Sequence, residues 1–299
     1  VSEISRIDLV ADWRFKPDPD HAGAHHNWAS PDLPDSDWAT LQAGVRWEDQ
    51  GFPNVDGYAW YRRRVDIPAD WQGKRIWLKV GGVRTEAWFW VNQQRVAHLN
   101  TYCGAYKYDI TDLVTPGETA ELVATVRNDS PSRKGCMNAY HRFGGFYRDI
   151  ELEATPLAYV DDVWVQSDID KPAAKVNIAV KGAAAGRTWS LDIQVKDKDG
   201  AVLGTLSRNA EPDGSGDIAV ICEVPLPEAR LWTPETPWLY VAEVTLREGE
   251  AVMHAGIDLQ LGIDGLVADG RGRRTGGHRR GVDRRLRAHQ RGPARSGGD

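Results

Sequence analysis

The clearest hydrophobic pattern in the chain is an alternation with a period of two along Arg75–Val80. Ile76, Leu78 and Val80 occupy every second position, and Trp77 stands between two of them. Successive side chains of a β-strand point to opposite faces of a sheet. The pattern therefore predicts a strand with one buried face and one wetter face that includes Trp77.

Turn residues divide the surrounding stretch, residues 47–92, into three short predicted strands. Asp56-Gly57 is a strong turn pair, and Pro68, Gly73 and Gly81-Gly82 mark the other breaks. The second and third of these strands are joined at the glycine pair. This stretch forms the centre of a predicted β-domain.

The chain before this stretch, residues 1–55, spreads Trp and Phe side chains among Pro, Gly and Asp and shows little helical periodicity. We interpret it as an extended segment that wraps a β-sandwich and is fixed by its Trp residues. After it, Leu122, Ala124 and Val126 alternate with neighbours and predict a further strand.

Beyond Pro156 the pattern becomes more regular and contains fewer aromatic residues. Alternating apolar positions predict strands around residues 176–180, 189–195, 218–224 and 240–246. Asp197-Lys198-Asp199-Gly200 predicts a hairpin turn between two of the strands. Strands at this spacing over about 100 residues are typical of an immunoglobulin-like sandwich. The sequence thus predicts two all-β domains, residues 1–156 and 157–262.

The net charge of −6 conceals two opposite contributions. Residues 263–299 hold ten Arg and four Asp, a balance of +6, so residues 1–262 carry −12. Such an acidic body is not expected to bind nucleic acid by neutralising phosphates. The chain has no run of eighteen apolar residues, so no membrane-spanning segment is expected. Three cysteines are too few and too scattered to predict a disulfide framework or a zinc site.

The segment 263–299 has nine Gly, no Lys and no aromatic residue, and it shows no alternation. Its composition predicts disorder. Two interpretations stay open: a basic arm for an acidic partner, or a stretch that arises from a frameshift or truncation and does not belong to the fold.

Catalytic motifs with fixed spacing are absent from the chain. It contains no His-Glu-x-x-His, Gly-x-Ser-x-Gly, Walker or Cys-x-x-Cys pattern. Carboxylates are plentiful, but no spacing predicts the close pair that glycoside hydrolysis requires. We therefore predict no catalytic residue and no metal ligand set from the residues alone.

A series of landmarks in fixed order resembles family 2 glycoside hydrolases over residues 10–262, the family of β-galactosidases, β-glucuronidases and β-mannosidases. The landmarks are Trp13-Arg14-Phe15 with Asp18-Pro19, Trp47-Glu48, Asp56 to Arg63, Val91-Asn92, Asp109-Ile110-Thr111, Gly144 to Ile150, and Leu231 to Tyr240. The first six resemble the family's first domain. The last resembles the closing strand of its second domain.

The resemblance implies a jelly-roll, galactose-binding-like β-sandwich followed by an immunoglobulin-like β-sandwich. In that family, catalysis takes place in a following (β/α)8 barrel that supplies an Asn-Glu acid/base and a Glu nucleophile. This chain has no Asn-Glu dipeptide, and 37 residues follow position 262, whereas a barrel requires about 250. The resemblance thus implies the N-terminal portion of a retaining, β-galactosidase-like glycosidase, and the chain alone is not expected to hydrolyse glycosides.

Three residues are candidates for contact with a carbohydrate. Asp149, paired with Arg148, matches a family aspartate that contacts the sugar and a nearby alkali cation, so the resemblance implies an alkali or calcium ion there. Asn100, in a predicted loop before Tyr106, lies where the family places a substrate-contacting Asn. For Arg148 and Asp149 a structural ion pair is the alternative, and for Asn100 an ordinary turn residue.

Two other functions stay open for the chain. The first is a stand-alone carbohydrate-binding module that uses exposed Trp side chains and Asp149. The second is an interaction protein in which the sandwiches are a scaffold and the Arg-rich arm binds acidic partners.

Overall fold

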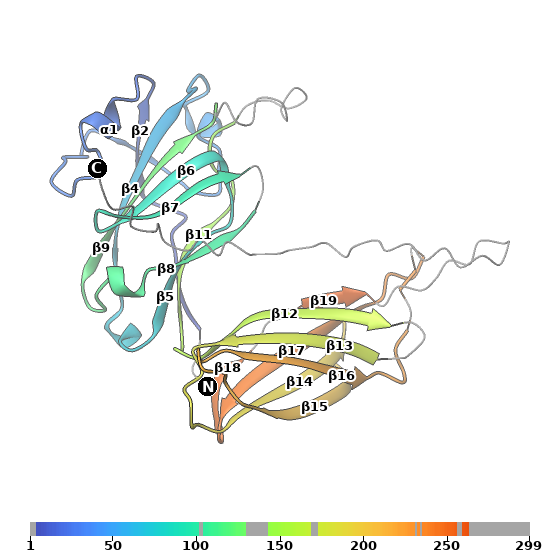
Figure 1. The fold of residues 1–299 in the computed structure, drawn as a ribbon. Coiled ribbons are helices and arrows are strands. Elements are labelled where there is room, and N and C mark those ends of the chain that lie inside the picture. The colour runs from blue at the N-terminus through green and yellow to red at the C-terminus, as the bar shows by residue number, and fades with distance from the viewer. Residues whose placement is uncertain are drawn as a thin grey trace, which may run out of the picture. The chain divides into compact units, whose positions relative to one another are not determined.

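The computed structural model describes residues 4–101, 104–129, 143–168, 173–230, 232–233, 235–255 and 259–262. The described residues are mostly in β-strands, and the few helices are single turns (Figure 1). They divide into two compact units, residues 6–154 and a unit that begins at Thr155. The predicted all-β class is confirmed. The segment 263–299, Cys103, Cys136, Leu231 and Pro234 lie outside the described residues.

The first unit contains two sheets. The four-stranded sheet has the order β1-β11-β5-β8, and the larger sheet has the order β10-β6-β9-β4-β2-β3, with β7 paired to β6. Their bounds are β1 Ser5–Asp8, β2 Trp13–Asp18, β3 Ala39–Leu41, β4 Tyr58–Asp66, β5 Arg75–Val80, β6 Val83–Val91, β7 Gln94–Thr101, β8 Tyr106–Asp109, β9 Thr119–Arg127, β10 Gly145–Phe146 and β11 Ile150–Thr155. The helical turns are α1 Ala22–His25, η1 Trp47–Gln50, η2 Ala69–Trp71 and η3 Thr111–Leu113.

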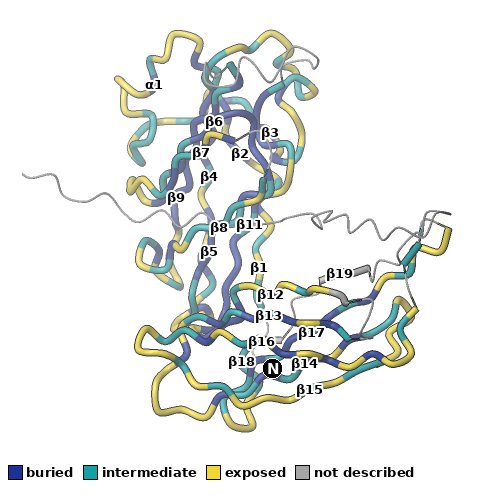
Figure 2. Tube along the Cα trace, turned by 45° about the vertical axis from the view of Figure 1, so that its right-hand side comes forward, coloured by how far each residue is buried: buried dark blue, intermediate teal, exposed yellow. Residues whose placement is uncertain are grey.

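The core of the first unit forms between the inward faces of these strands (Figure 2). Ile76, Leu78 and Val80 are buried there, as their alternation predicts. Trp77 differs from the expectation because it is 7% exposed on the opposite face. The cations of Arg75 and Lys107 lie over its ring, 5.8 and 4.9 Å from the ring centroid. Long charged side chains thus cover an aromatic ring on a face that the alternation predicts to be solvent-exposed.

The N-terminal segment is more than a wrapping segment, which corrects the sequence interpretation. Three parts of it are strands of the two sheets: β1, β2 and β3. Strand β2 lies between β3 and β4 in the larger sheet. The role of Trp as an anchor is confirmed for Trp13, Trp38 and Trp47, all of which are buried.

The second unit is a sandwich of a three-stranded sheet, β12-β13-β16, and a larger sheet, β15-β14-β17-β18, with β19 paired to β17. The bounds are β12 Tyr159–Asp168, β13 Ala173–Lys181, β14 Trp189–Asp197, β15 Val202–Ala210, β16 Ile218–Pro225, β17 Leu239–Glu248, β18 Ala251–Ala255 and β19 Leu259–Gly262. The hairpin predicted at residues 197–200 joins β14 to β15, and Gly200 there has a φ of +86°.

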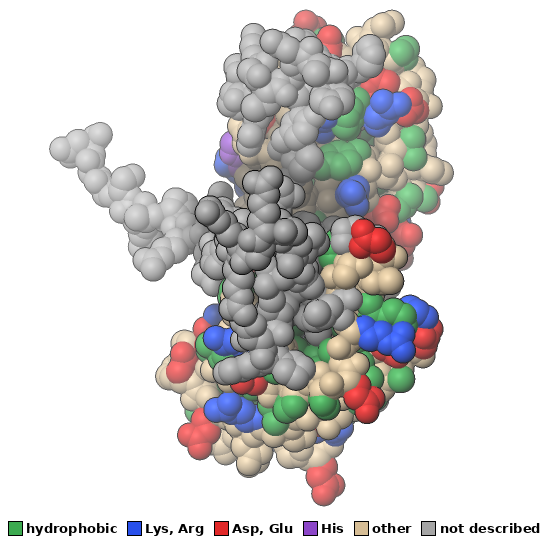
Figure 3. Space-filling view, turned by 90° about the vertical axis from the view of Figure 1, so that its right-hand side faces the viewer, with side chains coloured by type: hydrophobic (Ala, Val, Ile, Leu, Met, Phe, Trp, Pro, Cys, Tyr) green, Lys and Arg blue, Asp and Glu red, His purple; other side chains and the backbone are tan. Residues whose placement is uncertain are grey.

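The outward faces of the second unit differ in chemistry. Across the larger sheet, Lys196 pairs with Glu243 and Arg247 pairs with Asp192. The three-stranded sheet instead exposes Trp164, at 55%. On the face shown in Figure 3, acidic and basic side chains are interspersed rather than gathered by sign.

No helix among the described residues is long and apolar enough to cross a membrane.

Candidate functional site

Arg148 and Asp149 lie in the short link between β10 and β11, and this link is fixed to the turn between β5 and β6. The backbone N–H of Tyr147 donates to the carbonyl of Gly82 at 3.2 Å, and the N–H of Gly81 donates to the carbonyl of Asp149 at 2.8 Å. Both candidate side chains are exposed. The backbone of the pair is therefore held firmly while its charged groups face solvent.

Glycines provide the space that this arrangement needs. A Cβ placed on Gly81 would lie 2.8 Å from the carbonyl oxygen of Asp149, and one placed on Gly44 would lie 3.2 Å from Asp149 Oδ1. Gly44 also has a φ of +84°, which favours glycine. We refer to Gly44 and Gly81 as the glycine cradle of Asp149. The sequence marked Gly81-Gly82 only as a turn, so the cradle was missed.

The ion-pair interpretation of Arg148 and Asp149 finds no support in the structure. In the part of the chain that the structure describes, neither side chain forms an ion pair or a hydrogen bond. An exposed carboxylate accepts hydrogen bonds and an exposed guanidinium donates them. The two groups together can thus contact a polyhydroxylated ligand.

Asn100 lies in strand β7 and not in the predicted loop. It faces Glu86 in the register between β6 and β7, and it is exposed. Asp149 is bonded to Gly81 in the turn before β6, whereas Asn100 pairs with Glu86 inside β6. The structure therefore brings Arg148 and Asp149 together and does not place Asn100 directly beside them.

The surroundings of Asn100 on the larger sheet are polar and aromatic. His98 Nε2 and Glu86 Oε1 lie 2.8 Å apart. The ring of His98 stacks on Trp88, with centroids 4.6 Å apart and an interplanar angle of 5°. Arg127 of β9 is paired with Glu86 of β6, and it donates to Asp129 at 2.6 Å. Spacing along the sequence gives no signal for this cluster, because its members come from different strands.

A second polar cluster lies under the link that carries Asp149. Trp47 Nε1, Glu48 Oε2 and Tyr61 Oη are buried, and among the described residues they have no hydrogen-bond partner. Burial raises the pKa of Glu48, and the backbone N–H groups of Glu48 and Gly144 oppose that shift. Burial also raises the pKa of Tyr61 well above its ordinary value, and the charge of Glu48 adds to this effect.

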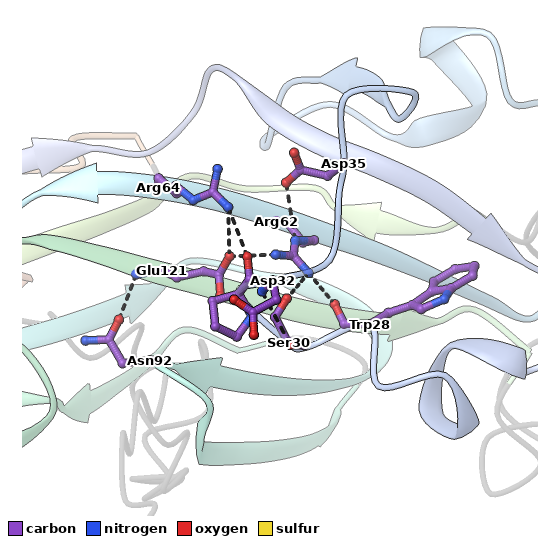
Figure 4. Close-up of polar contacts among 9 residues, drawn as sticks. Trp28, Ser30, Asp32, Asp35, Arg62, Arg64, Asn92 and Glu121 are labelled. Atoms are coloured by element: carbon purple, nitrogen blue, oxygen red, sulfur yellow. Dashed lines mark hydrogen bonds and ion pairs between the residues drawn. The ribbon is translucent and has the colours of Figure 1, made fainter.

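The most deeply buried charge in the first unit is structural. Arg62 Nη1 donates to the carbonyls of Trp28 and Ser30, both at 2.7 Å, and Arg62 Nη2 donates to Glu121 Oε1 at 2.6 Å (Figure 4). Its Nε lies 3.3 Å from Asp35. These contacts fix the segment before β3 over the sheet, and they leave the Arg62 side chain no exposed surface for a ligand.

The described residues offer no cluster of acidic side chains for the cation that the resemblance implies. They contain no group of three or more His, Cys, Asp or Glu side chains that could hold a metal ion. Calcium takes six to eight oxygen ligands, whereas Asp149 supplies a single carboxylate. We therefore assign no role to a cation here.

Comparison with known proteins matches both units. The model of "Glycosyl hydrolases family 2, sugar binding domain" matches residues 7–156, and that of "Glycosyl hydrolases family 2" matches residues 158–263. A β-glucuronidase of Paenibacillus borealis is 23% identical over 286 residues, which cover 88% of this chain and 46% of the relative. A β-galactosidase of Bacteroides ovatus is 22% identical over 276 residues, 85% of this chain and 31% of the relative.

Solved structures show the same fold. A Bacteroides uniformis β-glucuronidase superposes with a TM-score of 0.76 at 23% identity, over 87% of this chain and 32% of that one. A family 2 glycosyl hydrolase of Bacteroides cellulosilyticus gives a TM-score of 0.72 at 22% identity, over 86% and 36% of the two chains. The chain spans less than half the length of these relatives. It belongs to glycosyl hydrolase family 2 and holds the N-terminal β-sandwich portion of that family, including the sugar-binding domain.

Proposed function

We propose that the whole protein is a retaining β-glycosidase that acts on β-galactosides, and that Asp149 and Arg148 contact the sugar. The observation that carries the proposal is the exposed Asp149 carboxylate, which has no ion-pair or hydrogen-bond partner among the described residues and whose backbone is bonded to Gly81. A carboxylate accepts hydrogen bonds from neutral sugar hydroxyls, and the fixed backbone that carries it lowers the ordering cost of binding. Relatives named as β-galactosidases and β-glucuronidases support the substrate class.

The choice of galactoside over glucuronide rests on charge. A uronate carboxylate placed near Asp149 would be repelled, because like charges at short range disfavour binding. The hydroxyls of a galactoside meet no such penalty. Arg148 would favour the uronate, so the two side chains make opposite predictions for the two sugars.

The test measures binding of methyl β-galactoside and methyl β-glucuronide to the 299-residue chain by NMR titration. We expect Asp149→Asn to weaken galactoside binding about tenfold, as for the loss of a hydrogen bond to a charged group. Tighter binding of the glucuronide, weakened by Arg148→Ala and not by Asp149→Asn, would show that the galactoside assignment is wrong. Hydrolysis of p-nitrophenyl β-galactoside is measured on the longest product of the gene.

Asn100 belongs to the same proposal as a separate contact, because its amide offers both a donor and an acceptor. Asn100→Ala is expected to weaken binding of a longer β-galactoside more than that of methyl β-galactoside. This expectation follows because Asn100 pairs with Glu86 inside β6, whereas Asp149 is bonded to Gly81 in the turn before β6. Equal loss for the two ligands would place both residues at one sugar ring.

The alternative is a carbohydrate-binding protein without catalysis. The observation that favours it is the match of residues 7–156 to a sugar-binding domain, together with two β-sandwich units in the described residues. Binding of methyl β-galactoside by the longest gene product without turnover of any β-glycoside would support this alternative.

A further inference from the structure

The outward face of the three-stranded sheet β12-β13-β16 (Figure 1) carries an exposed aromatic ring. Trp164 of β12 is 55% exposed, and Ile221 of β16 is 58% exposed. Strand pairing places Asn177 of β13 between them. The amide Nδ2 of Asn177 donates to the backbone carbonyl of Trp164 at 3.1 Å, which leaves the amide oxygen available as an acceptor in the same row. No aromatic ring or cation of the described residues lies against the Trp164 indole.

Polar side chains lie on both sides of Trp164 along β12. Asp162 and Gln166 are exposed, and each lies two positions from Trp164, so the three side chains share the outward face. Across the sheet, Gln166 pairs with Lys175, and Lys175 pairs with Glu223. In the part of the chain that the structure describes, the side chains of these four polar residues form no ion pair or hydrogen bond. The ring therefore lies between polar groups that can bond to a ligand.

The outward charges of the larger sheet in the same unit are arranged differently. Lys196 pairs with Glu243, and Arg247 pairs with Asp192, in each case between the neighbouring strands β14 and β17. The charges of the larger sheet thus bind one another. Those of the three-stranded sheet stay available, and they surround its exposed ring.

The chemistry of this outward face fits a carbohydrate. A pyranose ring has an apolar C–H face, which the flat, amphipathic surface of an indole can cover. Its hydroxyl groups need donors and acceptors, and carboxylate, amide and ammonium groups supply both. Asp162 and Gln166 are about 13 Å apart along an extended strand, which exceeds the length of one pyranose ring. The face is therefore long enough to contact more than one sugar ring.

A protein partner fits the same face less well, because its apolar area is small. Among the described residues, Trp164 and Ile221 are the large apolar side chains that this sheet exposes. A fully covered aromatic side chain buries about 150–250 Å², whereas each partner of a stable protein interface buries about 800 Å² around an apolar core. Two apolar side chains do not make such a core.

We propose that this face binds a flat, β-linked oligosaccharide, one ring of which stacks on Trp164. We call it the Trp164 face, and it consists of Asp162, Trp164, Gln166, Lys175, Asn177 and Glu223. A chain of equatorially linked rings is extended, so its neighbouring rings can follow β12 toward Asp162 and Gln166. The match to a sugar-binding domain covers residues 7–156, so the Trp164 face is a separate site in the second unit. It does not depend on the proposed role of Asp149.

The experiment titrates cellotetraose and β-mannotetraose into the 299-residue chain. Calorimetry gives the affinity, and amide shifts in NMR spectra give the location. We expect shifts in β12, β13 and β16, and we expect Trp164→Ala to weaken binding about tenfold through the loss of the aromatic contact. Trp164→Phe keeps a smaller ring and should lose less. Val202→Ala is the control and should change nothing, since Val202 is 49% exposed but lies on β15 of the other sheet.

The inference is wrong if neither tetrasaccharide binds, if the shifts are confined to residues 144–149, or if Trp164→Ala binds as well as wild type. Sedimentation tests the other occupant: self-association that Trp164→Ala abolishes would make this face a contact between copies of the chain. If thermal unfolding shows that Trp164→Ala does not fold, the shifts in wild type and the affinity of Trp164→Phe decide.

Asp149→Asn separates this inference from the proposed function. It should weaken binding of methyl β-galactoside and leave binding of the tetrasaccharides unchanged. If it changes neither, the proposed function fails while the Trp164 face stands. If it weakens tetrasaccharide binding as Trp164→Ala does not, the oligosaccharide binds in the first unit and the inference fails.

Discussion

At the scale of single residues, the carboxyl of Glu153 makes the stability of the first unit depend on pH. It accepts hydrogen bonds from Lys79 at 2.9 Å and from Arg6 at 2.8 Å. Burial alone would raise the pKa of Glu153, but these two bonds outweigh burial and leave the pKa below its ordinary value. A folded-state pKa below the unfolded value stabilises the fold at pH values above the unfolded pKa. That stabilisation is lost as the pH falls through the folded pKa.

We therefore expect Glu153→Gln to lower the free energy of unfolding by about 1–3 kcal/mol at pH 7. The difference from wild type should shrink below about pH 4. Urea denaturation at pH 7 and pH 3 measures both values. Glu151→Gln is the matched control, because Glu151 contacts the same Lys79 but its side chain is 30% exposed, against 12% for Glu153. A difference that grows toward acid pH would contradict the assignment.

Arg62 is the residue whose loss should cost the most. Its side chain is 1% exposed, and that of its partner Glu121 is 8% exposed. Arg62→Met would leave the Glu121 carboxylate buried without its main cation. Removing one partner of a buried pair destabilises a protein by about 3–5 kcal/mol.

Chemical denaturation of Arg62→Met and Arg64→Ala compares a buried with an exposed cation of the same strand. Arg64 lies 3.7 Å from Glu121, and its side chain is 55% exposed. Its loss should cost no more than about 1 kcal/mol. Similar losses in the two variants would mean that burial does not increase the contribution of the Arg62 contacts in Figure 4 to the free energy of unfolding.

At the scale of elements, strands with clean alternation could be predicted from the sequence, and strands with mixed surroundings could not. The apolar positions of β13 and β14 are buried as their period of two requires. Strands β2 and β3 gave no such signal, because Pro, Lys and Thr interrupt their short runs. Strand β9 is buried on both faces, since Trp38 and Leu33 cover the face that carries Val123. A pattern along one strand does not show what packs on it.

The turn between β5 and β6 is the element that holds the candidate site in place. A Cβ on Gly81 would lie 2.8 Å from a backbone oxygen of Asp149, and backbone cannot move aside as a flexible side chain can. We expect Gly81→Ala to destabilise the first unit by about 1–3 kcal/mol. It should also weaken binding of methyl β-galactoside.

Thermal unfolding and sugar titration of Gly81→Ala are compared with those of Gly214→Ala. No atom lies within 4 Å of a Cβ at Gly214, so this control should change neither property. If Gly81→Ala is destabilised but binds the sugar as well as wild type, the turn supports the fold and does not position the sugar-binding residues.

At the scale of the whole molecule, the order of landmarks predicted more than any single motif did. The family and the fold class that they implied are confirmed by matches over residues 7–156 and 158–263. The geometry of the site could not be predicted in the same way. Asn100 and Asp149 are both candidates for sugar contact by resemblance, and strand pairing places Asn100 opposite Glu86 while Asp149 is bonded to Gly81. Register depends on strand pairing, and a linear order of motifs does not contain it.

The domain boundaries stay a prediction, and chain dissection tests them. We expect residues 1–156 and 157–262, produced separately, each to unfold in one cooperative thermal transition, because each described unit has its own hydrophobic core. Removal of residues 263–299 should leave both transitions unchanged, since that segment lacks the apolar residues that build a core. If residues 157–262 unfold without cooperativity while the 299-residue chain shows two transitions, the second sandwich depends on residues outside these bounds. If the two sandwiches fold independently, the first unit keeps the link that carries Asp149 whatever follows the second unit.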